Sequence, residues 1–452
     1  MRNFAHCVLL LLHRFGTMNC VFGMEKLMQY VWNHRLWRSE DMVTNTGKKV
    51  RVIDPGLLNT DAGPDFFNAK VEIDGRMWVG NVEIHYRASD WKRHHHDVDK
   101  AYDSVILHVV GKDDAPVRRT GGELIPQLVL EVSPQFYTDY ATLVNGTIEV
   151  SCAEKIKQVP QLTMVEWVSA LAFERLHGKV QRIHEMLERF NGSWEDVCYV
   201  TLARNLGFGI NNEAFERLAR KTPLRLLGKH SDSIFQIEAL LFGQAGMLEG
   251  NVQHADPYAQ QLATEYAFLR NKFQLSPMET QAWKLFRIRP QNFPYRRIAM
   301  LARFVEGGFR MMRRIVDAED EKQMRALFDV QLSGYWASHY TFGKPHERTA
   351  AALSQRSIDI VLINTVAPLL YAYGELTDSY ALTDKAIRLL EDLKPESNSI
   401  VAQFTSYGIP CPDALTSQAL VQLKREYCEA RKCMYCKIGH YLLSKSAHGE
   451  SI

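Results

Sequence analysis

The chain has 452 residues, of which 46 % are hydrophobic and 23 % are charged, so it is long enough for two or three globular domains and has the composition of a folded protein. Its formal net charge is +2 at pH 7, which excludes a uniformly basic or acidic chain but leaves room for a local charged face. The eight cysteines lie in a long chain without a recognisable signal peptide, which argues against a disulfide framework.

The first apolar run, from Cys7 to Leu12, is cut short by His13 and Arg14. It is shorter than the roughly 20 residues that a membrane-spanning helix needs, and no Ala-x-Ala cleavage site follows it. We interpret residues 1–23 as a non-native or disordered extension, with Met24 as the true start. We find no other stretch apolar enough to cross a membrane, so we expect a cytoplasmic protein with no membrane partner.

Residues 24–150 have the pattern of a small α/β domain. An amphipathic helix is predicted from Glu25 to Trp37. Strand-like segments follow at 49–53, 66–73, 77–86, 105–110 and 128–132. Asp74-Gly75 between the second and third of them is a strong hairpin signal, and a short helix is expected within 90–104.

Acidic residues and a histidine lie at one end of the predicted hairpin. Asp65 directly precedes the strand 66–73, and Glu83-Ile84-His85 ends the strand 77–86. Side chains two apart share a face of a strand, so Glu83 and His85 project together, and the hairpin brings Asp65 beside them. Carboxylates at a sheet edge suit Mg²⁺ or Mn²⁺, which leave coordination positions open for a substrate phosphate. We expect Asp65 and Glu83 to hold the ion while His85 orients or deprotonates water.

The order helix, strand, Pro64-Asp65, strand, Glu83-Ile84-His85 resembles the PD-(D/E)XK nuclease superfamily. In that superfamily an Asp and a Glu bind metal, and a Lys two residues after the Glu assists the nucleophile. The resemblance implies a restriction-endonuclease-like mixed sheet and a nuclease activity. His85 stands where the Lys is expected, so Lys70 on the preceding strand is a candidate to neutralise the scissile phosphate.

The chain from Met24 onward also resembles an uncharacterised bacterial domain-of-unknown-function family. The segments 80–85 and 289–294 and the terminal cysteines carry that resemblance, which implies no activity.

Histidines 94–96 follow the Glu83-Ile84-His85 strand. Their spacing does not match the His-x-His-x-Asp-His pattern of the metallo-β-lactamase fold, and a solvated loop is the favoured interpretation. The alternative is that one of them lines the same cleft as His85. His108 alternates with apolar residues on a buried strand and is expected to be a satisfied core histidine.

Residues 151–400 are predicted to be all-helical, and residues 401–452 to form a C-terminal helical segment. Leu176, Val180, Ile183 and Leu187 form an apolar stripe, which is typical of a helix packed on one face. Ser276-Pro277-Met278-Glu279 has the order of a helix start. Further helices are expected at 193–206, 233–248, 257–273, 297–306, 358–373, 379–393 and 414–443.

Four cysteines gather near the C-terminus, namely Cys411, Cys428, Cys433 and Cys436. Four thiolates suit a Zn²⁺ ion or a [4Fe-4S] cluster, and the sequence does not separate the two. Four protein ligands leave no open position, so a structural role is expected. The alternative is four buried cysteines without a ligand.

Between residues 284 and 314 lie nine basic side chains and a single acid, Glu306, interleaved with aromatic residues. Such a segment suits phosphate contacts and stacking on unpaired bases. The predicted nucleic-acid contacts are Arg287, Arg289, Asn292, Arg296 and Arg297. The alternative is that the arginines pair with acids or cap helices and that the aromatic rings lie in the core.

Together these features predict a metal-dependent phosphodiesterase or nuclease that acts on nucleic acid. The rival interpretations are an inactive nuclease fold that only binds nucleic acid, and an assembly protein with a structural metal. The choice between DNA and RNA and the oligomeric state stay open.

Overall fold

The computed structural model describes residues 17–37, 41–146, 149–249, 256–286, 288–343, 345–347, 349 and 351–447. The chain forms two compact units, one built from Met1–Trp167 with Leu423–Ile452 and the other from Val168–Gln422. The last segment of the chain therefore belongs to the sheet-containing unit. It does not form a separate region after the helices.

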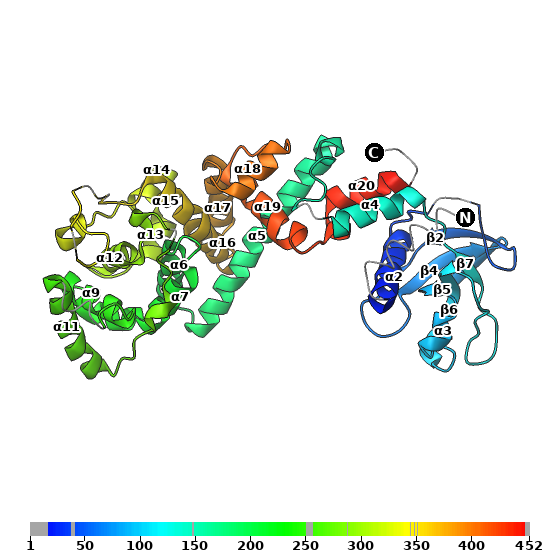
Figure 1. Ribbon diagram of the computed structural model, residues 1–452, viewed down its shortest axis with the longest axis horizontal. Coiled ribbons are helices and arrows are strands. Elements are labelled where there is room, and N and C mark those ends of the chain that lie inside the picture. Colours follow the sequence, from blue (N-terminus) through cyan, green and yellow to red (C-terminus); the bar gives the residue numbers. More distant parts are fainter. Residues whose placement is uncertain are drawn as a thin grey trace. The chain divides into compact units, whose positions relative to one another are not determined.

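A mixed sheet forms the first unit (Figure 1). Its strands are β1 (Met42–Val43), β2 (Lys49–Asp54), β3 (Leu57–Leu58), β4 (Phe66–Ile73), β5 (Arg76–Arg87), β6 (Val105–Lys112) and β7 (Gln127–Val129). The order is β1-β2-β4-β5-β6-β7, with β3 paired to β4. The strands β2, β4 and β5 are antiparallel, whereas β6 and β7 join in parallel. A bridge between Thr44 and Leu128 brings the two edges together, so the sheet is nearly closed and barrel-like.

The hairpin between β4 and β5 matches its prediction. Asp74 and Gly75 have φ values of 50° and 77°, which are the left-handed conformations that a two-residue hairpin turn needs. β4 has the predicted bounds and β5 differs from them by one residue at each end. The turn therefore sets the register from Ile73 to Ala69, and an irregularity between Phe66 and Ala69 shifts it by one residue before Asp65.

The period-two alternation along β5 separates two faces. Val82 and Ile84 point into a core shared with the helix α2 (Thr17–Asn33). This helix begins before the predicted Glu25 and ends before Trp37. Glu83 and His85 point to the opposite face, where the short helix α3 (Asp90–Arg93) packs on β5.

Two helices from distant parts of the chain complete the apolar side of the sheet unit. They are α4 (Pro134–Asn145) and α20 (Lys437–Ala447), which lie side by side (Figure 1). Leu143 and Leu443 join the same core as α2. Short 3-10 turns complete this unit: η1 (Lys100–Tyr102), η2 (Ile156–Gln158) and η9 (Cys433–Tyr435).

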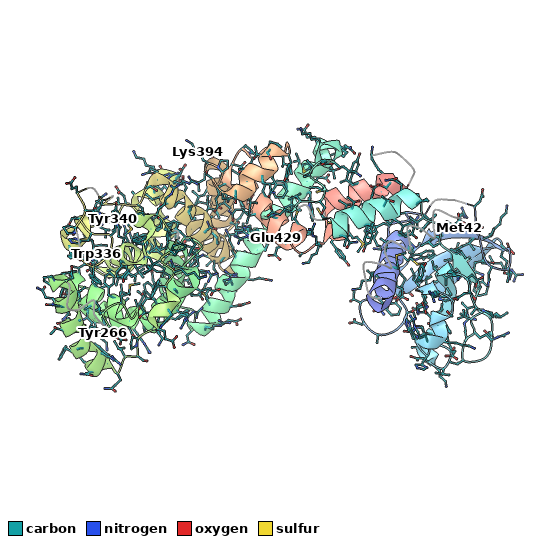
Figure 2. All side chains as sticks on the ribbon, viewed as in Figure 1. Met42, Tyr266, Trp336, Tyr340, Lys394 and Glu429 are labelled. Carbon is teal, nitrogen blue, oxygen red and sulfur yellow. The ribbon has the colours of Figure 1, made fainter. Side chains whose placement is uncertain are left out.

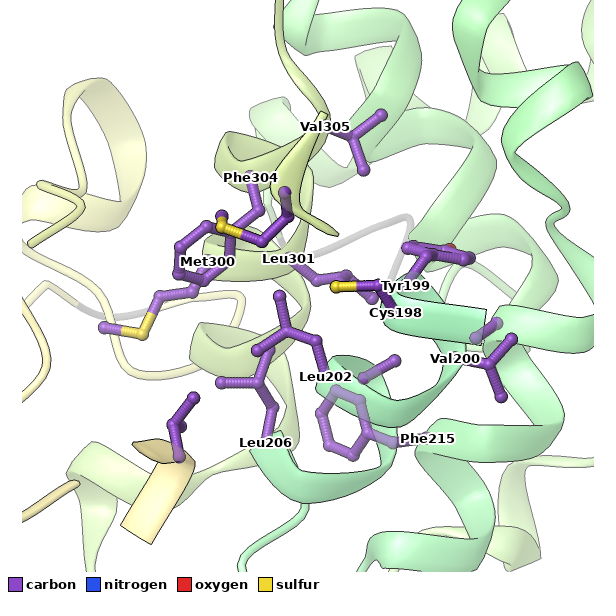
Figure 3. Packing of buried hydrophobic residues seen from close by; sticks show 14 of the residues in the cluster. Cys198, Tyr199, Val200, Leu202, Leu206, Phe215, Met300, Leu301, Phe304 and Val305 are labelled. Carbon is purple, nitrogen blue, oxygen red and sulfur yellow. The ribbon is translucent and has the colours of Figure 1, made fainter. Parts of the chain in front are cut away.

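The second unit is helical. Its helices are α5 (Gln161–Arg189, which begins in the first unit), α6 (Trp194–Leu206), α7 (Asn212–Lys221), α8 (Leu224–Leu227), α9 (Ile234–Gln244), α11 (Pro257–Phe273), α12 (Pro294–Val305), α13 (Met311–Asp317), α14 (Glu321–Ala326), α15 (Gln355–Val361), α16 (Ala367–Leu376), α17 (Tyr380–Asp392), α18 (Ser399–Ser406) and α19 (Ala414–Gln422). Figure 3 shows part of its core, where Leu301 and Phe304 of α12 lie in the same cluster as Cys198 and Leu202 of α6.

Two helix predictions in this half are wrong. The segment after Ser276 forms only the 3-10 turn η4 (Thr280–Ala282), because the N–H of Met278 donates to the carbonyl of Gln244 at 2.7 Å and ties the chain to the end of α9. The predicted helix 414–443 is broken into α19, a π-helical turn η8 (Leu423–Cys428), the η9 turn and α20.

In the described part of the chain, one helical stretch, Gln355–Leu376, is long and apolar enough to cross a membrane. Its most apolar window is 67 % buried inside the protein, as a core helix would be.

Candidate metal centre

The candidate centre lies where β5 extends beyond the start of β4. β4 begins opposite Val82, so the next residues of β5 have no β4 partner. Asp65 takes that place: its Oδ2 accepts from the N–H of Ile84 at 3.0 Å, and its own N–H donates to Glu83 Oε2 at 3.0 Å. Gln29 of α2 donates to Asp65 Oδ1 at 2.8 Å. The structure thus brings Asp65 and Glu83 together.

A third carboxyl group, that of Glu25 on α2, joins them. The backbone of Tyr86 hydrogen-bonds to it, and its Oε1 is buried without a hydrogen-bond partner in the described structure. The sequence interpretation missed Glu25. The available signal was its position among the apolar residues of α2, since it is buried next to Met24 and near Leu27.

Three histidines converge beside Glu83. His85 Nε2 lies 3.0 Å from His94 Nδ1 and 3.5 Å from Glu83 Oε1, and His96 Nε2 lies 3.4 Å from the same oxygen. One nitrogen of each of His85, His94 and His96 lies within 4.8 Å of the others. The expectation of a solvated loop is wrong for His96, which is 8 % exposed.

A reversal of the chain after α3 explains this convergence. The N–H groups of His94 and His96 donate to the carbonyls of Asp90 and Trp91, and His95 between them is exposed with φ of 63°. The left-handed residue turns the chain so that His96 is buried, whereas His94 stays exposed and reaches His85 with its Nδ1. Periodicity does not encode such a turn.

His108 on β6 orients His85. Its Nε2 lies 2.9 Å from His85 Nδ1, and its side chain is fully buried. Burial lowers the pKa of His108 to about 3, and burial together with the neighbouring histidines holds the pKa of His85 well below its usual range. Both rings are therefore neutral at pH 7. If His85 Nδ1 donates to His108, the lone pair on His85 Nε2 faces Glu83 and His94, as a metal ligand requires.

Aromatic rings hold the histidine cluster. The Tyr102 ring stacks on His96 with centroids 3.6 Å apart, and Trp91 is fully buried against His85, His96 and His108. Burial, followed by the charges of Glu83 and Asp65, raises the pKa of Tyr102 to about 12. Its hydroxyl therefore stays protonated.

The carboxyl groups resist ionisation. Burial, and then the charge of Glu83, raises the pKa of Asp65 to about 7. Burial raises the pKa of Glu83 to about 8, and Glu25 adds to the shift. Burial, and then Asp90, raises the pKa of Glu25 to about 7. A cation beside these three groups would favour their charged forms.

The donor set fits a metal ion. Zn–N bonds of about 2.0–2.1 Å put neighbouring ligands of a tetrahedral ion about 3.3–3.4 Å apart. The separations His85–His94, His85–Glu83 and His96–Glu83 given above lie close to that value, whereas the group whose donor atoms all lie within 4.8 Å of one another consists of the three histidines without Glu83. Imidazole nitrogens with a carboxylate suit Zn²⁺, Mn²⁺ or Fe²⁺ better than Mg²⁺, which prefers oxygen ligands.

Lys70 lies apart from this group. It is exposed on β4 and pairs with Val79, four residues before Glu83 on β5. Four residues of strand span about 13 Å, which is more than a lysine side chain reaches. The structure therefore does not place Lys70 where it would contact a phosphate held at Glu83.

The predicted nucleic-acid contacts on α12 need a correction. Arg296 and Arg297 are 0 % and 2 % exposed, so they cannot present a surface. Arg296 donates to the carbonyls of Trp336 and His339, both at 2.8 Å, and its guanidinium lies over the Tyr340 ring; Figure 2 labels Trp336 and Tyr340 in the helical unit.

The neighbouring contacts follow the same pattern. Arg297 donates to Asn292 Oδ1 at 2.7 Å and lies over the Phe208 ring, so Asn292 stabilises the fold as a partner of Arg297. Arg289 is exposed, and Arg287 lies outside the described residues. Arg296 and Arg297 therefore act in the core of the helical unit.

The four cysteines predicted to share a metal are divided between the two units. Cys411 belongs to the helical unit, where its Sγ lies 3.7 Å from the carbonyl oxygen of Asp413. Cys428, Cys433 and Cys436 belong to the sheet unit, and there they interact with Cys152. Nothing in the sequence spacing pointed to Cys152, which lies far from the other three along the chain.

A pocket of about 840 Å³ lies elsewhere on the sheet unit, lined by residues of β1, β2 and the β4–β5 turn, including Arg51 and Glu72. The residues that line this pocket include none of the carboxylates or histidines of the candidate centre, so the pocket and the candidate centre are separate.

The family described as "Protein of unknown function (DUF2851)" matches residues 25–399. The chain belongs to this family. The matched region contains the carboxylates and histidines of the candidate centre, whereas Cys428, Cys433 and Cys436 lie beyond it. No curated protein and no solved structure matches the chain. The function of this DUF2851 member is therefore argued from its geometry.

Proposed function

We propose that this DUF2851 protein is a metal-dependent phosphodiesterase that cleaves nucleic acid. The observation that carries the proposal is the convergence of Glu25, Asp65 and Glu83 with three neutral histidines at the end of β5. Buried groups of this kind, with strongly shifted pKa values, are typical of functional sites.

Each group has a role that follows from its surroundings. His85, His94, His96 and Glu83 would hold the cation, which when bound polarises a phosphoryl oxygen and acidifies a water molecule. Asp65 is partly exposed, and a pKa of about 7 suits a group that accepts a proton near neutral pH.

Arg93 replaces Lys70 as the candidate for binding phosphate. Its guanidinium lies 3.1 Å from Asp90 Oδ1 and 3.5 Å from His94 Nε2, and the side chain is 55 % exposed. A positive charge at the mouth of the centre is suited to stabilising charge that develops on a phosphate.

The order of elements supports the nuclease interpretation. Helix α2, the antiparallel strands β2, β4 and β5, helix α3 and the parallel strand β6 follow one another as the PD-(D/E)XK resemblance implies. The buried arginines of α12 do not support nucleic acid as the substrate. That substrate is proposed because of the PD-(D/E)XK resemblance and because the centre is suited to a phosphate group.

The test is cleavage of labelled single- and double-stranded DNA and RNA by the full chain with Mn²⁺, Zn²⁺ or Mg²⁺. Glu83→Gln removes a metal-facing charge and is expected to lower the rate by at least about 100-fold. The matched control is Glu123→Gln, because the Glu123 side chain is 75 % exposed and pairs only with its surface neighbour Arg119 among the described ion pairs.

Metal content, measured by mass spectrometry on the same samples, is expected to fall in His96→Asn and to stay unchanged in Glu123→Gln. Equal cleavage by wild-type protein and Glu83→Gln would overturn the assignment. Salt-sensitive binding of nucleic acid without cleavage under any metal would favour an inactive nuclease fold, and the absence of both would favour an assembly protein.

A further inference from the structure

A second group of candidate metal ligands, four cysteines, lies in the sheet unit. The inference drawn from it does not depend on the proposed function. Cys428, Cys433 and Cys436 precede α20, and Cys152 follows α4. Arg431 joins the two segments: its guanidinium donates to Ser151 Oγ at 2.5 Å and to the carbonyl of Gly146 at 2.8 Å. The Cys433 thiol also lies 3.4 Å from the carbonyl of Leu143, to which it donates.

Cys152 and Cys433 pack against the same apolar core of the sheet unit, and the N–H of Cys436 donates to the carbonyl of Cys433 at 3.3 Å. Burial raises the pKa of Cys152, and Cys428, Cys436 and Cys433 each raise it further. Burial raises the pKa of Cys428 to about 12 and that of Cys433 to about 11, and in both cases other cysteines of the group add to the shift. Cys411 belongs to the helical unit, where burial, and then the charge of Asp413, raises its pKa to about 11.

The surroundings favour thiolates once a cation is present. Burial raises the pKa of Cys436, but the backbone N–H groups of Ile438 and Gly439 at the start of α20 hydrogen-bond to its sulfur. Lys424 and Arg431 lower the pKa of Cys428. Hydrogen-bond donors and positive charges of this kind stabilise metal-bound sulfur.

Gly439 allows the cysteine turn to approach α20. A Cβ atom on Gly439 would lie 2.1 Å from the carbonyl oxygen of Cys433, so any other residue would push the turn away. The position of Cys433 and Cys436 beside Cys152 therefore depends on a packing that only glycine allows.

We propose that Cys152, Cys428, Cys433 and Cys436 hold an iron–sulfur cluster. A single Zn²⁺ with Zn–S bonds of about 2.3 Å needs sulfur atoms about 3.8 Å apart. Within the described residues no three of these sulfurs lie within 4.8 Å of one another. A cluster is larger than one ion and holds its ligands farther apart. The spacing Cys428-x4-Cys433-x2-Cys436 equals that of three of the four ligands in plant-type [2Fe–2S] proteins, in which the fourth cysteine follows the run, whereas Cys152 precedes it.

The cluster would join the two segments that flank the helical unit in the sequence. Cys152 lies just before the chain leaves the sheet unit at Trp167, and Cys428 lies just after it returns at Leu423. A cross-link between them closes a loop of more than 250 residues, which disfavours the unfolded state.

The test is anaerobic purification of the full chain, followed by assays for iron, acid-labile sulfide and zinc and by visible absorption. We expect iron and sulfide in equal amounts with sulfur-to-iron charge-transfer bands, and two or four irons per chain will identify the cluster type. Cys152→Ser should lose most of the iron and Cys411→Ser should keep it. Stoichiometric zinc without sulfide, or iron lost from Cys411→Ser alone, would overturn the proposal.

A measurement on wild-type protein covers the case in which Cys152→Ser does not fold. Thiol alkylation mapped by mass spectrometry should leave Cys152, Cys428, Cys433 and Cys436 unmodified until iron is removed by a chelator. Alkylation of Cys152 at the same rate before and after chelation would contradict its role as a ligand.

Discussion

At the residue scale, the shifted pKa values of the candidate centre arise because several carboxyl groups and several histidines lie close together. Asp65 and Glu83 share a short stretch of strand edge, Glu25 approaches from α2, and each is buried enough to disfavour its charge. The histidines beside them are neutral for the same reason. A site of this kind is unfavourable when its acids ionise without a cation and becomes favourable with one.

We predict that the metal-free protein loses stability as pH rises from about 6.5 to about 8. Below that range the buried histidines, which the unfolded chain protonates and the folded protein keeps neutral, change the stability in the opposite direction. The folded-state pKa values of Glu83 and Glu25 lie above the value of 4.5 for an unfolded glutamate, so the folded protein keeps protons that the unfolded chain has released. In that window the free energy of unfolding falls by up to about 1.4 kcal/mol per pH unit for each such group. Urea unfolding in chelator at several pH values measures this.

Glu83→Gln serves as the comparison for this pH dependence. It removes one titrating group, so its stability should depend less steeply on pH than that of the wild type. Saturating Mn²⁺ or Zn²⁺ should stabilise the wild type more at pH 8 than at pH 5, because protons compete with the cation. Identical slopes for the two proteins would show that Glu83 does not titrate in this range.

At the scale of elements, α12 shows how a helix can hide its charges. Its arginines read as a basic face in the sequence, yet ten residues of this helix are buried, including Arg296 and Arg297. The partners of these two arginines are carbonyl groups and aromatic rings and not the phosphates that the sequence suggested. The apolar residues interleaved with the arginines were the correct signal, and they indicate a core helix.

We predict that Arg296→Met lowers the free energy of unfolding of the helical unit by about 2–4 kcal/mol, because two buried carbonyls lose their donor. Arg313→Met should change it by less than about 0.5 kcal/mol, since the Arg313 side chain is 82 % exposed. Chemical denaturation followed by circular dichroism measures both. Arg296→Met with unchanged stability and weaker binding to nucleic acid would restore the surface interpretation.

At the scale of the whole molecule, the sheet unit is assembled from both ends of the described chain. Leu443 of α20 is fully buried in the core that contains α2 and β5, although more than 400 residues separate it from Leu27. The match to the DUF2851 family ends at residue 399, before this helix begins. The segment after it is nevertheless part of the fold that carries the candidate centre.

We predict that Leu443→Ala destabilises the sheet unit by about 2–5 kcal/mol through the cavity that it leaves. The helical unit should be unaffected, so unfolding should separate into two transitions of which only one shifts. Calorimetry measures this, and Lys445→Ala, which retains the apolar face of α20, is the control. A shift of both transitions together would show that the two units unfold as one.

The sequence by itself determined the parts of this protein that depend on neighbours along the chain. The Asp74-Gly75 turn and the alternation of β4 and β5 set the hairpin register as far as Ala69 and Gly80, and a one-residue shift between Phe66 and Ala69 then places Asp65 beside Glu83. The stripe of α5 follows in the same way from the helical period. Backbone geometry fixes these relations within a few residues.

Only the tertiary structure decided which distant residues complete each cluster. It added Glu25 and the histidines of the α3 turn to the carboxylates, placed Cys411 in a different unit from Cys428, Cys433 and Cys436, and buried Arg296. These relations depend on how α2 packs against β5, on a left-handed residue at His95 and on the return of α20 to the sheet unit. Spacing in the sequence does not encode them, because each arises from contacts that form when separate elements pack together.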